Sequence, residues 1–395
     1  MIISNEIFER VLSIDKFIID SAPIGHLKNR LSQWFNEIIF SDFSLPSVKD
    51  GDVVFFRSLV RDDYYESFHA VIRASGIRNP VIIDDYITAS NPQRMNRATS
   101  RFMLDNQDLF DHINETDGLK RAILFIRLCK YAFIKHHFKN TKPRLVVFHA
   151  DMQPVEYLLA CHFRSLGVTT VTLQHGLYVD YSGYDTINKI NYLHQPSEYF
   201  LSWGPSTSEL IRRHHPDTKI IECGKPLISS ANPPDLAPET SPYIALLLDQ
   251  KPFHRQNEEM IEIVQAYALR SGLDIRVRFH PSLPKAAILT KYPFLTEQLH
   301  FTDAQMVVGH TSTMIYEALA LGCHVMRFAS DIPAIKLPKN SEFRTLEELE
   351  AHAVFPVPSD LSQYYFTAFG DEALENYKSF FASLLSTPSE RLAHG

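Results

Sequence analysis

The stretch 170–183, TVTLQHGLYVDYSG, shows how the first half of the chain folds. Residues 168–173 are apolar or β-branched, which is the pattern of a buried strand of ordinary length. This run ends abruptly in Gln174, His175 and Gly176. Because glycine lets the backbone turn sharply, we expect the strand to stop at this triplet. Open α/β sheets bind ligands at the carboxyl ends of their strands, so the triplet is a candidate site.

Short apolar runs alternate with helical stretches along both halves of the chain. In the first half we expect helices at 62–75 and 154–166, and strands at 52–56, 80–83, 145–149, 168–173, 199–202 and 219–222. In the second half we expect helices at 257–271 and 313–321, and strands at 243–248, 274–279, 306–308 and 324–328. This alternation predicts parallel sheets with helices on both faces. The segment 91–139 is expected to be a mostly helical addition to the first sheet.

A proline-rich stretch, ISSANPPDLAPETSP (228–242), separates the two halves and is the expected linker. A chain of 395 residues is too long for one ordinary core, and two domains of roughly 150–200 residues are the expectation. We therefore expect an N-terminal domain at 1–227 and a C-terminal domain at 243–358. The tail, 359–395, is expected to carry a helix that packs back on the N-terminal domain.

Composition and charge exclude several classes of protein. The net charge of −7 argues against general electrostatic capture of nucleic acid, so we expect no nucleic-acid partner. The four cysteines are far apart in the sequence, which favours neither a disulfide framework nor a zinc site. The sequence has neither a signal-peptide pattern nor the roughly 18–20 apolar residues needed to span a bilayer. We expect a cytoplasmic protein, and the basic stretch 130–144 is a candidate contact for acidic acceptors or for the inner face of the membrane. The alternative is an ordinary charged helix face.

The stretch MVVGHTSTMIYEALALG (306–322) predicts an anion site in the second domain. A short strand runs into Thr311, Ser312 and Thr313, which stand at the mouth of an amphipathic helix. Hydroxyls and backbone N–H groups at a helix N-terminus bind phosphate well. Glu317, one turn later, is placed to reach a ribose hydroxyl. The alternative is an ordinary helix cap, with Glu317 facing solvent.

A second phosphate-binding candidate is RVRFHPSLPK (276–285), in which His280 follows the end of a strand. A histidine held by the next proline can donate a hydrogen bond to a phosphate oxygen, and Arg278 can add charge. The alternative is a turn with a solvated histidine. No GxGxxG follows any strand, and the chain has only 14 glycines, so a dinucleotide site is not expected. No DxD pair accompanies these motifs, so we expect neither a metal ion nor another cofactor.

The matching features of the first domain are FHADMQPVEY (148–157) and the triplet that ends the strand at 168–173. Transfer to a hydroxyl group needs a base, and His175 suits this role because the ordinary pKa of histidine is about 6.5. Asp151 can serve as base or nucleophile, or can orient His175. The alternatives are a helix-capping Asp151 and a His175 bound within its turn. Further candidate contacts with a donor or acceptor are Gln174, Gly176, Lys225, Asp249 and Gln250.

Taken together, QHG, GKPL, FHP and GHTSTMIYEALALG resemble motifs of bacterial surface-polysaccharide glycosyltransferases of the capsule and lipopolysaccharide type. The similarity covers about residues 145–330. It implies a GT-B fold, with two Rossmann-like domains facing a cleft. The His-Pro motif followed by a Ser/Thr motif is similar to that of sialyltransferases, polysialyltransferases and CMP-Kdo transferases. In those enzymes the histidine and the hydroxyl cluster contact the CMP phosphate, which implies this role for His280, Thr311, Ser312 and Thr313.

The chain departs from the CMP-sugar pattern at one place, where the acidic-acidic-Gly motif stands as Gln174–His175–Gly176. Either His175 is then the base, or the carboxylate comes from elsewhere, with Asp151 first in line. We expect transfer of a CMP-linked sugar such as Kdo or a sialic acid to a glycan or glycolipid acceptor. One alternative is a polyol-phosphate transferase, since the His-Gly pair also resembles the CDP-glycerol glycerophosphotransferases. The others are a sugar-nucleotide epimerase of the same fold and a non-catalytic binding protein.

Overall fold

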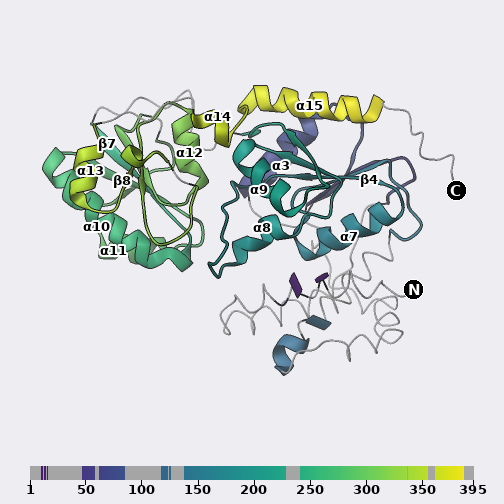
Figure 1. Ribbon diagram of the computed structural model, residues 1–395, viewed down its shortest axis with the longest axis horizontal. Helices are drawn as coiled ribbons and strands as arrows, with labels where there is room; N and C mark the ends of the chain where they lie inside the picture. Colours follow the sequence, from purple (N-terminus) through teal and green to yellow (C-terminus); the bar gives the residue numbers. More distant parts are fainter. Residues whose placement is uncertain are drawn as a thin grey trace.

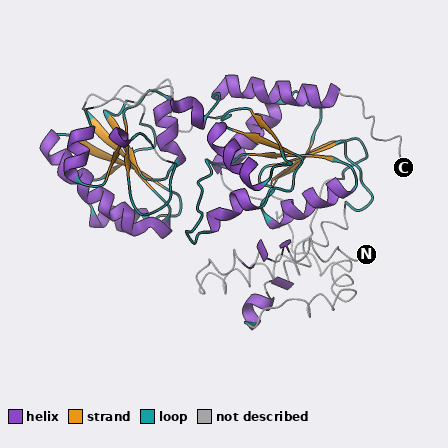
Figure 2. Cartoon of the chain, in the orientation of Figure 1, coloured by secondary structure: helices purple, strands orange, loops and turns teal. Residues whose placement is uncertain are grey.

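The computed structural model describes residues 10–11, 13–14, 16, 47–57, 62–84, 117–122, 124–125, 138–227, 241–301, 303–335, 337–354 and 361–386. Most of the predicted helical addition at 91–139 and of the basic stretch 130–144 lies outside these residues, as does 228–240 of the expected linker. The described part forms two α/β domains that lie side by side (Figure 1). Each of these domains is called a layer below. Each layer has a central sheet with helices against it (Figure 2).

The first sheet has six parallel strands in the order β2-β1-β3-β4-β5-β6. The strands are β1 (Val53–Arg57), β2 (Val81–Asp84), β3 (Leu145–Phe148), β4 (Thr169–Leu173), β5 (Tyr199–Ser202) and β6 (Lys219–Glu222). Its helices are α3 (Asp62–Ala74), α7 (Pro154–Ser165), α8 (Ile190–Leu193) and α9 (Pro205–His214). Strand β3 is buried along its whole length, as expected for an inner strand covered on both faces.

The second sheet also has six parallel strands, in the order β12-β11-β10-β7-β8-β9. They are β7 (Tyr243–Leu248), β8 (Asp274–Phe279), β9 (Thr296–Glu297), β10 (Met306–Gly309), β11 (Val325–Phe328) and β12 (Glu342–Phe343). The helices of this half are α10 (His254–Ser271), α11 (Lys285–Lys291), α12 (Thr313–Ala320) and α13 (Leu346–His352). The six residues of β7 are all buried, whereas both residues of the edge strand β9 are exposed.

Both sheets have a point at which the order of the strands reverses. In the first sheet β1 lies between β2 and β3, and in the second β7 lies between β8 and β10. The crossovers on either side of such a point run to opposite faces of the sheet, which opens a crevice at the carboxyl ends of the strands. The structure therefore places the predicted sites, which follow β3, β4, β7, β8 and β10, at or next to these two crevices.

The alternation of side chains along the strands explains the two cores of the first layer. Val146 and Phe148 of β3 pack with α7 on one face, whereas Leu145 and Val147 pack with α3 on the other. Residues of α15 (Gly370–Ser386) join the second of these cores, and the ring of Phe381 lies 5.9 Å from that of Phe55 in β1. The prediction that a C-terminal helix packs back on the first sheet is confirmed (Figure 1).

The chain returns to the first layer through α14 (Ser362–Tyr365) and a short extended segment. The Lys225 N–H, after β6, donates to the Ala368 carbonyl, and the Gly370 N–H donates to the Lys225 carbonyl. Gly224 has a φ of 93°, and a Cβ at this position would overlap the Ala368 backbone. These bonds anchor the returning segment to the carboxyl edge of the first sheet.

The predicted strands agree with the structure to within one residue at either end. The sequence reasoning missed β9 and β12, which are two-residue edge strands too short to show a pattern. It also missed helices α8, α9, α11 and α13, and it started α10 three residues late. The proposed domain boundaries, 1–227 and 243–358, each enclose one of the two sheets.

Candidate active site between the two sheets

Two histidines lie side by side at the carboxyl edge of the first sheet. His149 follows β3 and is buried, and His175 follows β4 and is half-buried. Their ring centroids are 5.9 Å apart. The Tyr64 ring, on the first turn of α3, lies 5.1 Å from the His149 ring and 5.5 Å from the His175 ring. Strands β3 and β4 and helix α3 thus bring three groups capable of hydrogen bonding to one place.

The Tyr178 hydroxyl lies 3.0 Å from Nδ1 of His175. Tyr178 is buried, and burial raises the pKa of its hydroxyl well above the ordinary value. The phenol is therefore protonated at physiological pH, and it remains a hydrogen-bond partner of the histidine ring.

Gln174 has a structural role, since its side chain is buried and both its amide nitrogen and its amide oxygen are hydrogen-bonded. Its Nε2 donates to the Gly176 carbonyl at 2.7 Å and to the Thr207 hydroxyl at 2.9 Å, and its Oε1 accepts from the Trp203 N–H at 2.6 Å. These bonds fix the loop that carries His175. They also occupy the groups that were predicted to contact a donor or acceptor.

Strand β4 ends at Leu173 and the backbone bends at Gly176, as predicted, but the bend does not need a positive φ at the glycine. Gly176 is absent from the glycines with positive φ, and a Cβ there would have no atom within 4 Å. A side chain is therefore sterically possible at this position. The glycine instead leaves open space beside His175.

Asp151 lies beneath the sheet edge rather than at its surface. It is fully buried, and its Oδ2 accepts from the Ser197 N–H at 2.9 Å, while its own N–H donates to the Thr172 hydroxyl at 3.3 Å. It does not cap α7, whose N-cap position is Gln153. Burial raises the pKa of Asp151 to about 6, although hydrogen bonds from Ser197 and Thr172 oppose the rise. These contacts favour a structural role.

Replacing Asp151 with asparagine tests this assignment. Because the pKa of Asp151 is higher in the folded protein than its ordinary value of 3.8, its contribution to stability is full below about pH 4 and is lost as the pH rises through 6. Asparagine resembles the protonated acid and can still accept from Ser197. We expect Asp151→Asn to raise the free energy of unfolding at pH 8 by up to about 3 kcal/mol, with the gain disappearing near pH 4.

Urea unfolding at the two pH values measures this difference, with the exposed Asp217→Asn as the control. An equal change at both pH values would contradict the proposed titration. A folded Asp151→Asn variant that had lost turnover would instead support the catalytic role predicted from the sequence.

At the carboxyl edge of the second sheet, Asp249 organises the loop before α12. Its Oδ2 accepts from the N–H of Thr311 at 2.6 Å and from the Thr311 hydroxyl at 2.7 Å, and it lies 3.6 Å from Nδ1 of the buried His310. Burial alone would raise the pKa of Asp249, but the nearby His310 ring and the two hydrogen bonds from Thr311 outweigh it and lower the pKa. Asp249 is thus an ionised, internal carboxylate. Both donors of Thr311, which were predicted to bind phosphate, are directed at it.

The other two hydroxyls of the Ser/Thr motif have different partners. The Ser312 side chain caps α12 by accepting from the Met314 N–H at 3.3 Å. The Thr313 hydroxyl accepts from the Leu177 N–H at 3.3 Å, which joins α12 to the loop that carries His175. Among the described residues, no acceptor binds the backbone N–H groups of Ser312 and Thr313. The N-terminus of α12 therefore lies beside the His175 loop with two N–H donors available.

His280 is half-buried after β8, and its Nδ1 is engaged within its own turn. Nδ1 accepts from the Ser282 N–H at 3.1 Å, so the neutral ring carries its proton on Nε2. Arg278 points elsewhere, since its guanidinium donates to the Leu299 carbonyl, which follows β9. Gln250 is half-buried directly after Asp249 and precedes the 3-10 helix Lys251–Phe253.

Lys225 and Glu317, predicted as separate substrate contacts, are bonded to each other. The Lys225 Nζ lies 3.0 Å from Oε1 of Glu317, and the two side chains are 8% and 3% exposed. Lys225 follows β6 in the first layer, and Glu317 lies on α12 in the second. The Nζ also lies 5.2 Å from the centre of the Trp203 ring. This buried ion pair links the two layers next to the candidate site.

The structure therefore brings the loop that carries His175 into contact with Thr313, and Asp249 into contact with Thr311, whereas Asp151 and Arg278 are bonded away from these loops. Sequence reasoning missed three contributors, Tyr64, Tyr178 and His310. Two of them stood within the quoted motifs, but the sequence alone did not show which side chains they would contact. Within the described part of the chain, no group of three or more metal-ligating side chains is present.

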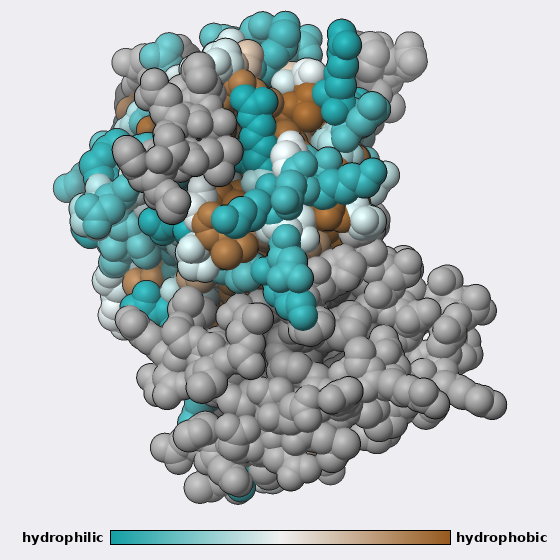
Figure 3. All heavy atoms as spheres, turned by 90° about the vertical axis from the view of Figure 1, so that its right-hand side faces the viewer, coloured by the Kyte–Doolittle hydropathy of each residue, from teal (hydrophilic) through white to brown (hydrophobic). Residues whose placement is uncertain are grey.

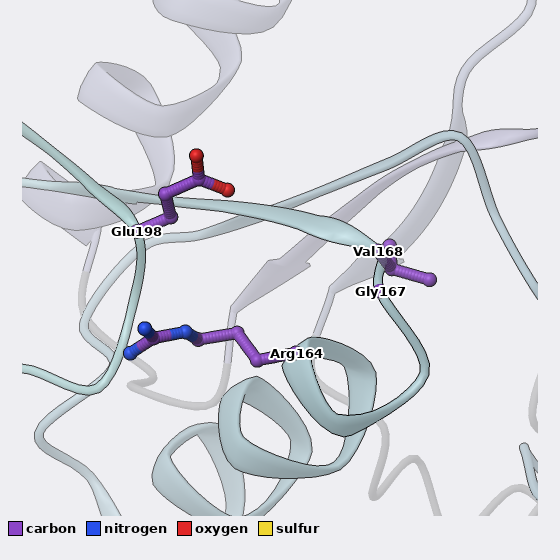
Figure 4. Close-up of a pocket in the computed structure, with 4 residues that line it drawn as sticks. All are labelled: Arg164, Gly167, Val168 and Glu198. Atoms are coloured by element: carbon purple, nitrogen blue, oxygen red, sulfur yellow. The ribbon is translucent and has the colours of Figure 1, made fainter. Parts of the chain in front are cut away.

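A shallow pocket of about 290 Å³ lies at the opposite, amino edge of the first sheet and is lined by Arg164, Gly167, Val168 and Glu198 (Figure 4). These residues lie just before β4 and β5, far along the strands from His175. On the face shown in Figure 3, hydrophilic residues are interspersed with small hydrophobic areas. The amino edge of the first sheet, where the pocket lies, has neither the histidines nor the helix N-terminus of the candidate site.

Comparison with known proteins supports the fold. No protein-family model matches the sequence, and no curated protein sequence is significantly similar to it. The chain resembles the UDP-GlcNAc 2-epimerase of Methanocaldococcus jannaschii, solved with UDP-GlcNAc and UDP (12% identity, TM-score 0.52, covering 85% of this chain and 100% of that chain). It also resembles MnaA of S. aureus, solved with UDP (12%, 0.51, 86% and 98%).

At these identities the resemblance establishes the fold. The predicted class is confirmed: an α/β protein of GT-B type with two Rossmann-like domains. Within the described residues, no helix has the length and apolar character needed to cross a membrane.

Proposed function

We propose that this protein is an enzyme that acts on a nucleotide-activated sugar. The nucleotide binds at the carboxyl edge of the second sheet, and the sugar lies between the two edges, next to His175. The observation that carries this proposal is the bond from the Leu177 N–H to the Thr313 hydroxyl, at 3.3 Å. It joins the loop of the first domain that carries His175 to the helix N-terminus of the second.

The phosphate would be held by groups that favour negative charge. The N–H groups of Ser312 and Thr313 stand at the N-terminus of α12, where the helix dipole attracts anions. His280 adds an Nε2–H donor from the neighbouring loop, because its Nδ1 is taken by Ser282. Asp249 binds Thr311 and so holds the loop in shape, but its negative charge keeps phosphate away from that side.

The reaction that we propose first is glycosyl transfer to a hydroxyl group of a glycan or glycolipid. The donor class that the motifs favour is a CMP-linked 3-deoxy acid such as Kdo or a sialic acid, by the resemblance of the His280 and Thr311–Thr313 motifs. No metal ion is part of this proposal, because the N-terminus of α12 and the Nε2–H of His280 supply hydrogen bonds to the phosphate. Polyol-phosphate transfer from a CDP-linked donor uses the same groups.

Epimerisation of a nucleotide sugar is the second candidate. An epimerase needs no acceptor but requires several acid–base groups around the sugar. His149, His175, Tyr64 and Tyr178 form such a group, with ring centroids 5.1–5.9 Å apart where they adjoin. The two structures that this chain resembles contain UDP, so UDP-GlcNAc is the first epimerase substrate to test.

The nucleotide site is tested by the thermal stability of the protein with CMP, CDP, UMP, UDP, GDP and dTDP. A ligand that binds only the folded state at 100 times its Kd adds about 2.7 kcal/mol of stability. We expect one nucleotide class to raise the Tm, and His280→Ala to weaken its binding about tenfold or more, because a hydrogen bond to a charged group is lost.

His300→Ala is the matched control, since His300 lies in the connection between β9 and β10 and not in the loops that follow β7, β8 and β10. A selective response to CMP favours the CMP-sugar donor, and a response to UDP favours the epimerase or a hexosyltransferase. The same shift in wild type and His280→Ala would refute the proposed phosphate contact, and no shift with any nucleotide would refute the site.

A further inference from the structure

We infer that Tyr178 positions the ring of His175 and sets its tautomer, so that His175 offers the substrate a hydrogen bond from Nε2–H. The sequence reasoning assigned His175 as a base, and this inference changes that role to a donor. It rests on the proposed function for the substrate. The hydrogen bond between Tyr178 and His175 itself is a property of the protein alone.

The position of the phenol is fixed by packing. Tyr178 is 2% exposed and belongs to a core cluster that includes Phe200 of β5, whose ring lies 6.0 Å away. The same cluster contains Phe253 and Ile332 from the second domain. The Tyr178 hydroxyl therefore has little freedom to move, and its oxygen is held 3.0 Å from Nδ1 of His175.

The direction of the hydrogen bond follows from the state of the phenol. Burial raises the pKa of Tyr178 well above its ordinary value, although a hydrogen bond from the His175 backbone opposes the rise, so the hydroxyl keeps its proton. A buried O–H needs an acceptor, and Nδ1 of His175 is within reach. A neutral ring that accepts at Nδ1 carries its proton on Nε2.

The consequence concerns the chemistry at the reacting centre. A neutral His175 with its proton on Nε2 cannot take a second proton there. To act as a base through Nε2, the ring would have to move its proton to Nδ1, and the Tyr178 hydroxyl would have to turn away from its acceptor, which is costly inside a core. The Nε2–H group instead suits an oxygen that gains negative charge during the reaction, such as a phosphate, carboxylate or hydroxyl oxygen of the substrate.

The tautomer is measured directly by ring ¹H–¹⁵N NMR of the ligand-free protein at pH 8, where the neutral form is observed. The His175 signals are assigned by their loss in His175→Gln. We expect the pattern of an Nε2–H ring in the wild type, and a change towards a mixture of tautomers in Tyr178→Phe. Tyr181→Phe removes a buried hydroxyl from the same loop and should leave the pattern unchanged. An Nδ1–H ring in the wild type would overturn the inference.

Turnover gives the second readout. Glutamine keeps an N–H donor but cannot act as a base, so His175→Gln should retain at least about ten times the activity of His175→Ala. Tyr178→Phe should lower kcat about tenfold while leaving KM nearly unchanged, because the donor is present but no longer positioned. If His175→Gln were as inactive as His175→Ala, the donor role would be wrong. Since the NMR experiment needs no substrate, an Nε2–H ring in a protein that binds no nucleotide would refute the proposed function alone.

Discussion

Glu317→Ala should destabilise the protein by about 3–5 kcal/mol, because it leaves the Lys225 ammonium buried without its carboxylate. The two side chains are 8% and 3% exposed, so water cannot replace the lost partner. Lys225 also stands where the returning C-terminal segment is bonded to the first sheet. The destabilisation should therefore affect the contact between the two layers as well as α12.

Urea unfolding measures this loss of stability, and two further variants serve as controls. Lys219→Met breaks the ion pair of Lys219 with Glu198, whose lysine is 51% exposed, and should cost less than about 1 kcal/mol. The double variant Lys225→Met with Glu317→Leu removes both charges and should recover most of the stability lost in Glu317→Ala. If Glu317→Ala cost no more than Lys219→Met, the buried pair would not be a link between the layers.

His175→Ala should reduce turnover by about 100- to 1,000-fold, the typical effect of removing one hydrogen-bond donor from a reacting centre. Nucleotide binding should survive, because the proposed phosphate contacts belong to α12 and His280 in the other domain. The half-buried ring also holds the Tyr178 hydroxyl, so we expect a smaller loss of stability, about 1–3 kcal/mol.

Steady-state kinetics and nucleotide-dependent Tm shifts separate these effects. His352→Ala is the control, since His352 ends α13 and its Nδ1 contacts the Glu342 carbonyl. Loss of both turnover and nucleotide response in His175→Ala would place His175 in the nucleotide site itself. Full turnover in a folded His175→Ala variant would show that His175 has no role in the reaction.

The fold was predictable because several of its inner strands are apolar without interruption. YIALLL of β7 and LVVF of β3 are buried on both faces and read as strands without any tertiary information. The two-residue strands β9 and β12 could not be found, because they exist only through pairing with β8 and β11. The confirmed α/β class rests on the long elements, which carry most of the pattern.

For the candidate site, the sequence predicted which loops lie together but not which side chains in them are bonded to each other. Parallel strands place His175, His280 and Thr311 at carboxyl edges, and this follows from the order of elements. The bonding partners do not follow from it. Asp249 lies 62 positions before Thr311 in the sequence, and Lys225 meets Glu317 across the domain contact. Such pairs depend on the completed fold, which is why Thr311 was predicted to bind phosphate although its donors face Asp249.

The most direct test of the central claim, that this protein transforms a nucleotide sugar, is ³¹P NMR of the purified protein with the sugar derivatives of whichever nucleotide raises its Tm. Transfer or hydrolysis should release the free nucleotide, whereas epimerisation should keep the nucleotide sugar intact and shift its phosphorus signals. Either change should be about 100-fold slower or more with His175→Ala. Unchanged spectra for every sugar derivative of a nucleotide that binds would contradict the account.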